Sequence, residues 1–253
     1  MSDIYINDKI IENIKLVVFD KDGTLIEIHK YWAQMILARA KGICQKANIS
    51  IENVSMLMNA MGVNFETMML KPEGPVGIKK REVVLESAVS CLAKIGLNSE
   101  YARKIIFDVF LDIDKLSLEK LSEFIIPING ALNLISKLKN LGVKIAIATT
   151  DKTERAEIAL KHLKWDHYFD FVVGADMVSL VKPDKEMIEL IMLKLNVSRQ
   201  QTIMVGDAET DILMGFNADV KASIGVLTGL SSRDKLLPHT EFIVNSVEDI
   251  KVL

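Results

Sequence analysis

Two aspartates one residue apart, Asp20 and Asp22, follow an apolar run in the stretch LVVFDKDGTL, residues 16–25. The apolar run is typical of a strand buried on both faces of a parallel sheet. Two carboxylates this close repel each other, so the spacing favours a cation between them or a proton held by one. Gly23 lets the chain turn and lets backbone approach a ligand. Taken alone, the same residues also suit an ordinary strand-ending turn.

Three later stretches carry further polar groups at predicted strand or helix ends. These groups are Thr149 and Thr150 after the apolar run VKIAIA, Lys182 before Pro183 and a helical pattern, and Gly206 and Asp207 after TIMV with Asp211 one helical turn later. Each has a plain structural explanation as a helix cap, an exposed lysine or a first-turn acid. Because parallel strands end at one edge of a sheet, we expect the groups to converge there.

The elements that position these groups change character along the chain. Apolar residues at helical spacing fill residues 29 to 124, interrupted by the loop LKPEGPVG at residues 70–77, and no strand is predicted there. From residue 127 onwards, helical and strand patterns alternate through four further strands. This alternation indicates an α/β fold with a doubly wound parallel sheet. We expect a core of residues 1–27 and 126–253 and a smaller helical domain, residues 28–125, inserted after the first strand.

Composition limits the possible partners. Apolar residues make up 49% and charged residues 26% of the 253 residues, and the net charge is −3. These values give no electrostatic reason to expect nucleic acid or an anionic membrane as partner. Cys44 and Cys91 lie far apart, which argues against a disulfide framework and fits a reducing cytoplasm. No signal peptide or membrane span is predicted. We therefore expect a cytoplasmic protein, and nothing in the sequence indicates its oligomeric state.

The four motifs in this order, DxDGT, Thr, Lys before a helix and GDxxxD, resemble those of the haloacid dehalogenase (HAD) superfamily. The resemblance extends from about residue 14 to 230. It is greatest to members with a helical cap after the first strand, the phosphoglycolate phosphatase and β-phosphoglucomutase group. It implies a Rossmann-like core, a cap domain, and a Mg²⁺-dependent phosphatase that hydrolyses a small soluble phosphorylated metabolite through an aspartyl-phosphate.

The resemblance also implies roles for individual residues. Asp20 is the nucleophile, and Asp22 is the general acid for the leaving alkoxide and then the base for water. Lys182 and Thr149 complete the catalytic set.

Phosphate binding is assigned by the same resemblance to the backbone after Asp22 and to the later motifs. The residues implied are Gly23, Thr24, Thr149, Thr150 and Lys182. Thr149 and Thr150 compete for the second-motif position. We prefer Thr149 because its spacing from Gly142 resembles the turn-strand-threonine pattern of the family.

The implied Mg²⁺ site consists of Asp20, Asp22 through its backbone carbonyl, and Asp207. Asp211 is expected one step further from the ion, where it would orient Lys182 or a metal-bound water. Glu209 is an alternative ligand.

Two groups of basic residues are harder to interpret. Lys21 stands where relatives often have an apolar residue, and we expect its side chain to point opposite to the two aspartates. Lys79, Lys80 and Arg81 follow the loop at residues 70–77. One of them would contact a second anionic group of the substrate, unless the three form an exposed helix start.

Three other functions remain open. A phosphomutase of the same superfamily would use the same residues but return the phosphoryl group to a sugar. A signalling receiver domain also combines acids, threonine and lysine, but it lacks a helical insert after the first strand. A binding protein without catalysis is disfavoured because every motif position is filled.

Overall fold

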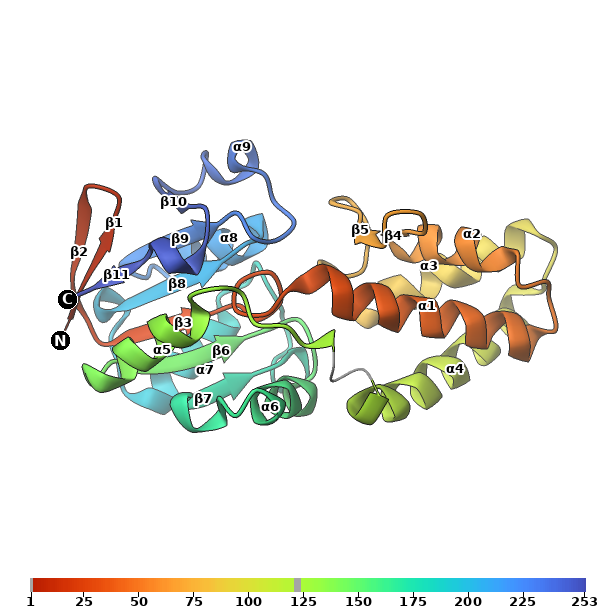
Figure 1. Cartoon of the computed structure of the whole chain (residues 1–253), viewed down its shortest axis with the longest axis horizontal. Coiled ribbons are helices and arrows are strands. Elements are labelled where there is room, and N and C mark those ends of the chain that lie inside the picture. The colour runs from red at the N-terminus through yellow and green to blue at the C-terminus, as the bar shows by residue number, and fades with distance from the viewer. Residues whose placement is uncertain (1, 121–123) are drawn as a thin grey trace. The chain divides into compact units, whose positions relative to one another are not determined.

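Strand β3, Leu16–Phe19, lies inside a six-stranded parallel sheet in the computed structural model, which describes residues 2–120 and 124–253 (Figure 1). The strand order is β10-β9-β8-β3-β6-β7, and every neighbouring pair is parallel. The other strands of this sheet are β6 Lys144–Ala148, β7 Phe171–Val173, β8 Thr202–Gly206, β9 Ala222–Val226 and β10 Phe242–Val244. All four residues of β3 are buried, as the apolar run predicted.

The order in which the chain builds this sheet creates a reversal next to β3. The chain passes from β3 to β6 and β7 on one side, and then to β8, β9 and β10 on the other. Ligands of open α/β sheets bind at such a reversal, outside the carboxyl ends of the strands. The predicted α/β class and doubly wound parallel sheet are confirmed.

Helices cover both faces of the sheet. Leu16 and Val18 belong to a buried cluster with Met187 of α7 and Met214 of α8. The alternate residues of β3 point to the opposite face, and the buried residues of α5 and α6 are absent from that cluster. Among the described residues, the α-helices that follow residue 126 are α5 Ala131–Asn140, α6 Thr153–His162, α7 Glu186–Leu195, α8 Glu209–Asn217 and α9 Arg233–Leu236.

A small antiparallel sheet joins the two ends of the described chain. Strand β1, Ser2–Ile6, pairs with β2, Lys9–Ile14, and with β11, Lys251–Val252. No element was predicted for the first 15 residues. The alternation of buried and partly buried residues along β1 shows that one face of this sheet packs inward.

The chain divides into two compact units, residues 1–27 with 126–253, and residues 28–125. The second unit contains helices α1 Ile28–Ala47, α2 Asn53–Met61, α3 Arg81–Lys94 and α4 Ser99–Lys120. Residues 121–123 of the predicted helical domain lie outside the described residues.

The prediction that residues 29 to 124 contain no strand is wrong at one place. Strand β4, Val63–Asn64, pairs antiparallel with β5, Met69–Leu70. The Asn64 side chain accepts hydrogen bonds from the amides of Glu66 and Thr67, at 2.9 and 3.1 Å, and so shapes the turn between them. Two-residue strands are too short to produce a period in the sequence.

The two chain segments that lead into and out of the insert run side by side. Ile26 forms an antiparallel bridge with Pro127, and the Ile128 amide donates to the Leu25 carbonyl oxygen at 2.9 Å. The insert is therefore closed at its base by backbone hydrogen bonds.

Candidate active site

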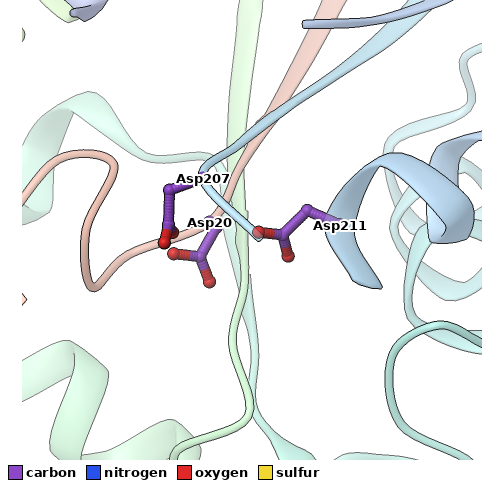
Figure 2. Close-up of side chains that lie close together, drawn as sticks. All are labelled: Asp20, Asp207 and Asp211. Carbon is purple, nitrogen blue, oxygen red and sulfur yellow. The ribbon is translucent and has the colours of Figure 1, made fainter. Parts of the chain in front are cut away.

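Three buried aspartates meet at the carboxyl edge of the central strands. Asp20 directly follows β3, Asp207 directly follows β8, and Asp211 lies in the first turn of α8. One carboxylate oxygen of each lies within 4.8 Å of the others, and Figure 2 shows the three side chains converging. The Asp20 amide donates to the Val205 carbonyl oxygen at 2.8 Å, so the sheet ladder itself sets the position of Asp20 beside β8.

Lys182 is the cation of this cluster. Its Nζ lies 2.5 Å from Oδ1 of Asp20 and 2.6 Å from Oδ1 of Asp211, and its side chain is 2% exposed. Burial lowers the pKa of Lys182, but the charges of Asp20 and Asp211 outweigh burial and hold the pKa above its usual value. Lys182 is therefore charged, and with all three carboxylates ionised the cluster has a net charge of −2.

Lys182 offsets only part of the negative charge of the three carboxylates. Burial raises the pKa of Asp20 to about 6, against the attraction of Lys182. Burial and the charge of Asp20 also raise the pKa of Asp207. Oδ2 of Asp20 is buried and has no hydrogen-bond partner among the described residues. Buried oxygens, one of them unpartnered, and two surplus negative charges fit a hard divalent cation such as Mg²⁺.

Asp207 is held in place by groups from two loops. Its Oδ1 accepts from Thr24 Oγ1 at 3.3 Å, and its Oδ2 accepts from the Leu230 amide at 2.9 Å. The preceding residue in each loop is a glycine that lies close to the carboxylate, because a Cβ at Gly229 would lie 1.8 Å from Oδ2 and a Cβ at Gly23 would lie 2.7 Å from Cγ. The carboxylate thus lies where any side chain at these two positions would clash.

These contacts place Gly23 and Thr24 beside the Asp207 carboxylate, and their phosphate-binding roles stay a prediction. The Gly23 amide donates to the Ile26 carbonyl oxygen at 2.7 Å, because the turn folds back on itself, and the Thr24 hydroxyl donates to Asp207. In this conformation both residues shape the turn that holds a carboxylate.

Asp22 lies apart from the three-carboxylate cluster. Its Oδ2 is 2.8 Å from Nζ of Lys21, and burial raises the pKa of Asp22 although the charge of Lys21 lowers it. The expectation that Lys21 points away from both aspartates is therefore wrong. Strand β3 ends at Phe19, so the alternation of side chains does not continue to residue 21. Coordination of an ion by the Asp22 carbonyl stays a prediction.

The two threonines after β6 differ in their surroundings. Thr149 is buried and its amide donates to the Val173 carbonyl oxygen at 2.9 Å, whereas Thr150 is partly exposed. Oγ1 of Thr149 accepts from the Asp151 amide at 3.2 Å, which leaves the hydroxyl hydrogen to donate elsewhere. This geometry favours Thr149 as a donor to a bound phosphate.

Asp211 and Glu209 have different partners. Oδ2 of Asp211 accepts from the Ala208 amide at 3.0 Å and caps the start of α8, while Oδ1 contacts Lys182. Glu209 instead lies 2.9 Å from Nε2 of His239 and is not part of the carboxylate cluster. The ion pair shows which cation Asp211 contacts, and its orienting role stays a prediction.

The basic residues of the insert separate into two kinds. Lys79 and Lys80 are exposed. Arg81 lies 3.0 Å from Asp114 Oδ2 and stacks at 5.3 Å over the ring of Phe110, inside its own unit. Arg81 therefore supports the packing of α3 on α4.

The loop that follows β9 was not predicted to reach this site. It supplies the Leu230 amide, the close approach of Gly229, and the Thr228 hydroxyl, which donates to the Gly23 carbonyl oxygen at 2.6 Å. Backbone donors leave no signature in residue type. The one available signal was the position of this loop after a parallel strand, which puts it at the same edge as Asp20.

Within the described residues, no helix combines the length and the low charge that crossing a membrane requires.

Sequence comparison relates the chain to curated phosphatases. It is 41% identical over 98 residues to pyrophosphatase PpaX of Halalkalibacterium halodurans, a match that covers 39% of this chain and 46% of that protein. It is 31% identical over 156 residues to pyrophosphatase PpaX of Bacillus cereus, covering 56% of this chain and 72% of that protein. The chain spans about half the length of the first curated relatives it matches.

Solved structures share the fold over almost the whole chain. A predicted phosphatase from Clostridium acetobutylicum is 27% identical, with a TM-score of 0.62, and the match covers 93% of this chain and 95% of that one. A predicted phosphoglycolate phosphatase from Haemophilus somnus is 19% identical, with a TM-score of 0.71, and the match covers 94% and 96%. The family model of haloacid dehalogenase-like hydrolases matches residues 14–219. The chain belongs to the haloacid dehalogenase-like hydrolases.

Proposed function

We propose that the chain is a Mg²⁺-dependent phosphatase in which Asp20 attacks the phosphorus of a small phosphorylated metabolite. The observation that carries this proposal is the asymmetry of the Asp20 carboxylate. Lys182 holds Oδ1, and Oδ2 is buried with no hydrogen-bond partner among the described residues. A carboxylate fixed through one oxygen has the other available for nucleophilic attack or for a metal ion.

Electrostatics explains why a cation is part of the proposal. Two unit negative charges 4 Å apart repel by about 4 kcal/mol at an effective dielectric constant of ~20, so a phosphate dianion would be strongly repelled by the carboxylate cluster. Asp20 and Asp207 would hold Mg²⁺, and Asp211 would orient Lys182 beside it. When bound, the ion would offset this repulsion and polarise the phosphoryl group.

The remaining steps use side chains of the core. Lys182 and the Thr149 hydroxyl would donate to phosphoryl oxygens, where charge accumulates in the transition state. Asp22 would give a proton to the leaving oxygen and then accept one from the water that hydrolyses the aspartyl-phosphate. The raised pKa of Asp22 suits a group that has to carry a proton in the first step.

The unit of residues 28–125 has a separate role in this proposal. It would act as a cap that selects the substrate, while the unit of residues 1–27 and 126–253 carries out the chemistry. Cytoplasmic location and action on a free metabolite belong to the same proposal.

The test is release of inorganic phosphate from a panel of phosphorylated compounds, with Mg²⁺ and in excess EDTA. The panel includes phosphoglycolate, sugar phosphates and, because of the PpaX relatives, pyrophosphate. We expect stoichiometric phosphate release from at least one compound in Mg²⁺ and none in EDTA. Isomerisation of a sugar phosphate without phosphate release would indicate a phosphomutase instead. Full activity in EDTA would refute the metal-dependent mechanism.

A further inference from the structure

A row of four charged side chains links the end of β3 to α6. Nζ of Lys21 lies 2.8 Å from Asp22 Oδ2 and 3.6 Å from Asp151 Oδ2, and Arg155 Nε lies 3.3 Å from Asp151 Oδ1. Side chains in this row are 12% exposed or less. We call Asp22, Lys21, Asp151 and Arg155 the acid–base row.

The acid–base row differs in charge from the cluster around Lys182. It contains two cations and two carboxyl groups, so its charges cancel without any added ion when both carboxyl groups are ionised. Burying ionised groups is costly unless each has a partner, and this pairing supplies one to each. The row therefore needs no metal ion to balance its charges.

Asp151 gives the row a fixed anchor. Its carbonyl oxygen accepts from the Ala175 amide at 2.9 Å, directly beyond β7. Gly174 lies so close that a Cβ there would be 2.7 Å from the same oxygen. Arg155, in the first turn of α6, then forms an ion pair with the carboxylate. Lys21 thus ties Asp22 to a position defined by the neighbouring strands and by α6.

We propose that Lys21 is a positioning residue that fixes the orientation of the Asp22 carboxylate for proton transfer. The proposal rests on the phosphatase function above, in which Asp22 protonates the leaving oxygen. An apolar residue at position 21 would leave Asp22 without the 2.8 Å contact. The carboxylate would then sample several rotamers, and proton transfer depends on precise placement of the donor.

This role predicts a dependence on the leaving group. An alkyl phosphate has to be protonated as its alkoxide leaves, whereas p-nitrophenolate leaves readily without a proton. The second step, attack of water on the aspartyl-phosphate, needs Asp22 as a base with either substrate. A misplaced Asp22 should therefore slow alkyl transfer and hydrolysis, but not the first release of p-nitrophenolate.

The experiment uses Lys21→Met, with Lys144→Met as a control. Lys144 starts β6, and its exposed side chain donates to the Leu195 carbonyl oxygen, away from the acid–base row. For Lys21→Met we expect kcat on an alkyl phosphate to fall about 10²-fold with little change in KM. With p-nitrophenyl phosphate, the pre-steady-state burst should keep its rate while the steady-state rate falls. Lys144→Met should leave all these rates unchanged.

A second variant covers the case in which Lys21→Met does not fold. Asp151→Asn keeps the pair of Lys21 and Asp22 but weakens its anchor, and should give the same pattern with a smaller loss. Lys21→Arg, which keeps the charge, should restore part of the alkyl activity. Equal losses in the burst and in turnover, or no loss in a folded Lys21→Met protein, would overturn the role of Lys21. A wild-type protein that releases phosphate from no substrate would instead overturn the phosphatase proposal on which it rests.

Discussion

The Nζ of Lys182 lies 2.5 Å from Oδ1 of Asp20 and reaches it from a loop 162 residues further along the chain. The same ammonium contacts Asp211, so one cation holds two of the three clustered carboxylates. Because Oδ1 is engaged in this way, the reactivity proposed for Asp20 falls on Oδ2.

Replacing Asp20 with Asn should abolish turnover while leaving the protein folded. An amide is a poor nucleophile and a poor Mg²⁺ ligand, so we expect kcat to fall by more than about 10³-fold. The substitution also removes one of the surplus negative charges, so the melting temperature in EDTA should not decrease. Rapid-quench labelling should detect phosphorylated wild-type protein and no label on the variant. Retained turnover would disprove covalent catalysis by Asp20.

Removal of the Lys182 charge should cost both activity and stability. Lys182→Met leaves Asp20 and Asp211 buried without their cation, and breaking a buried ion pair in this way costs about 3–5 kcal/mol. Lys185→Ala is the matched control, because Lys185 is exposed and pairs with Glu189 on the surface of α7. Its loss should change the free energy of unfolding by less than about 0.5 kcal/mol. Urea unfolding in EDTA compares the two variants, and similar values would contradict the prediction.

Stability without metal should fall as the pH rises. The pKa of Asp20 is raised from 3.8 to about 6 by burial, so the folded protein binds this proton more tightly than the unfolded chain does. The corresponding stability is fully present below pH 4 and is lost as the pH rises through about 6. The loss is about 3 kcal/mol for this carboxyl. Mg²⁺ binds the ionised form, so the stabilisation that it adds should grow over the same pH range.

Unfolding curves in EDTA and in Mg²⁺ from pH 4 to 8 measure this dependence. Asp20→Asn is the control, because it lacks the titrating group and should lose this part of the slope. Identical slopes for the wild type and the variant in EDTA would show that Asp20 does not titrate in this range.

A methyl group at Gly229 should weaken metal binding. Its Cβ would lie 1.8 Å from Asp207 Oδ2, so the carboxylate has to move. By analogy with other residues that support metal ligands, we expect Gly229→Ala to raise the Mg²⁺ concentration for half-maximal activity about 10- to 100-fold. Gly142→Ala is the control, because Gly142 has φ of +73° but no atom within 4 Å of the added Cβ. It should cost stability of about 1 kcal/mol without changing the Mg²⁺ requirement.

Substitutions of the basic residues at the start of α3 should have two different effects, one on substrate specificity and one on stability. If Lys79 or Lys80 contacts a second anionic group of the substrate, its replacement by Ala should raise KM for substrates that carry such a group. The KM for p-nitrophenyl phosphate, whose only anionic group is its phosphate, should not change. Arg81→Ala should instead lower the melting temperature, because Arg81 is paired with Asp114. An unchanged substrate ranking in both lysine variants would place specificity elsewhere in the insert.

The parts of the site that could be predicted from sequence are charged residues whose position at the end of a strand or the start of a helix could also be predicted. Asp20, Asp207 and Lys182 carry charges, and the alternation of strands and helices places their segments at one sheet edge. The parallel sheet followed from the same alternation.

The parts that could not be predicted depend on backbone geometry. The Leu230 amide supports Asp207, yet an amide donor is present in every residue except proline. The predicted direction of the Lys21 side chain was wrong, because it was inferred from the alternation of side chains in a strand that ends two residues earlier. The Gly23 amide donates to the Ile26 carbonyl oxygen and closes its own turn, a backbone pairing that residue type does not reveal.

The antiparallel bridge between Ile26 and Pro127 has a consequence for how the molecule tolerates change. Closing a flexible loop of roughly 100 residues costs about 4 kcal/mol in chain entropy, but that cost grows only slowly with length. Because the two bridged segments already lie side by side, the pairing of the strands in the sheet does not depend on the residues inserted between them. We therefore expect a much shorter or longer insert to leave the strand register of the core unchanged. The position after β3 is thus a site where one inserted domain could be replaced by another while the carboxylates of the core stay in place.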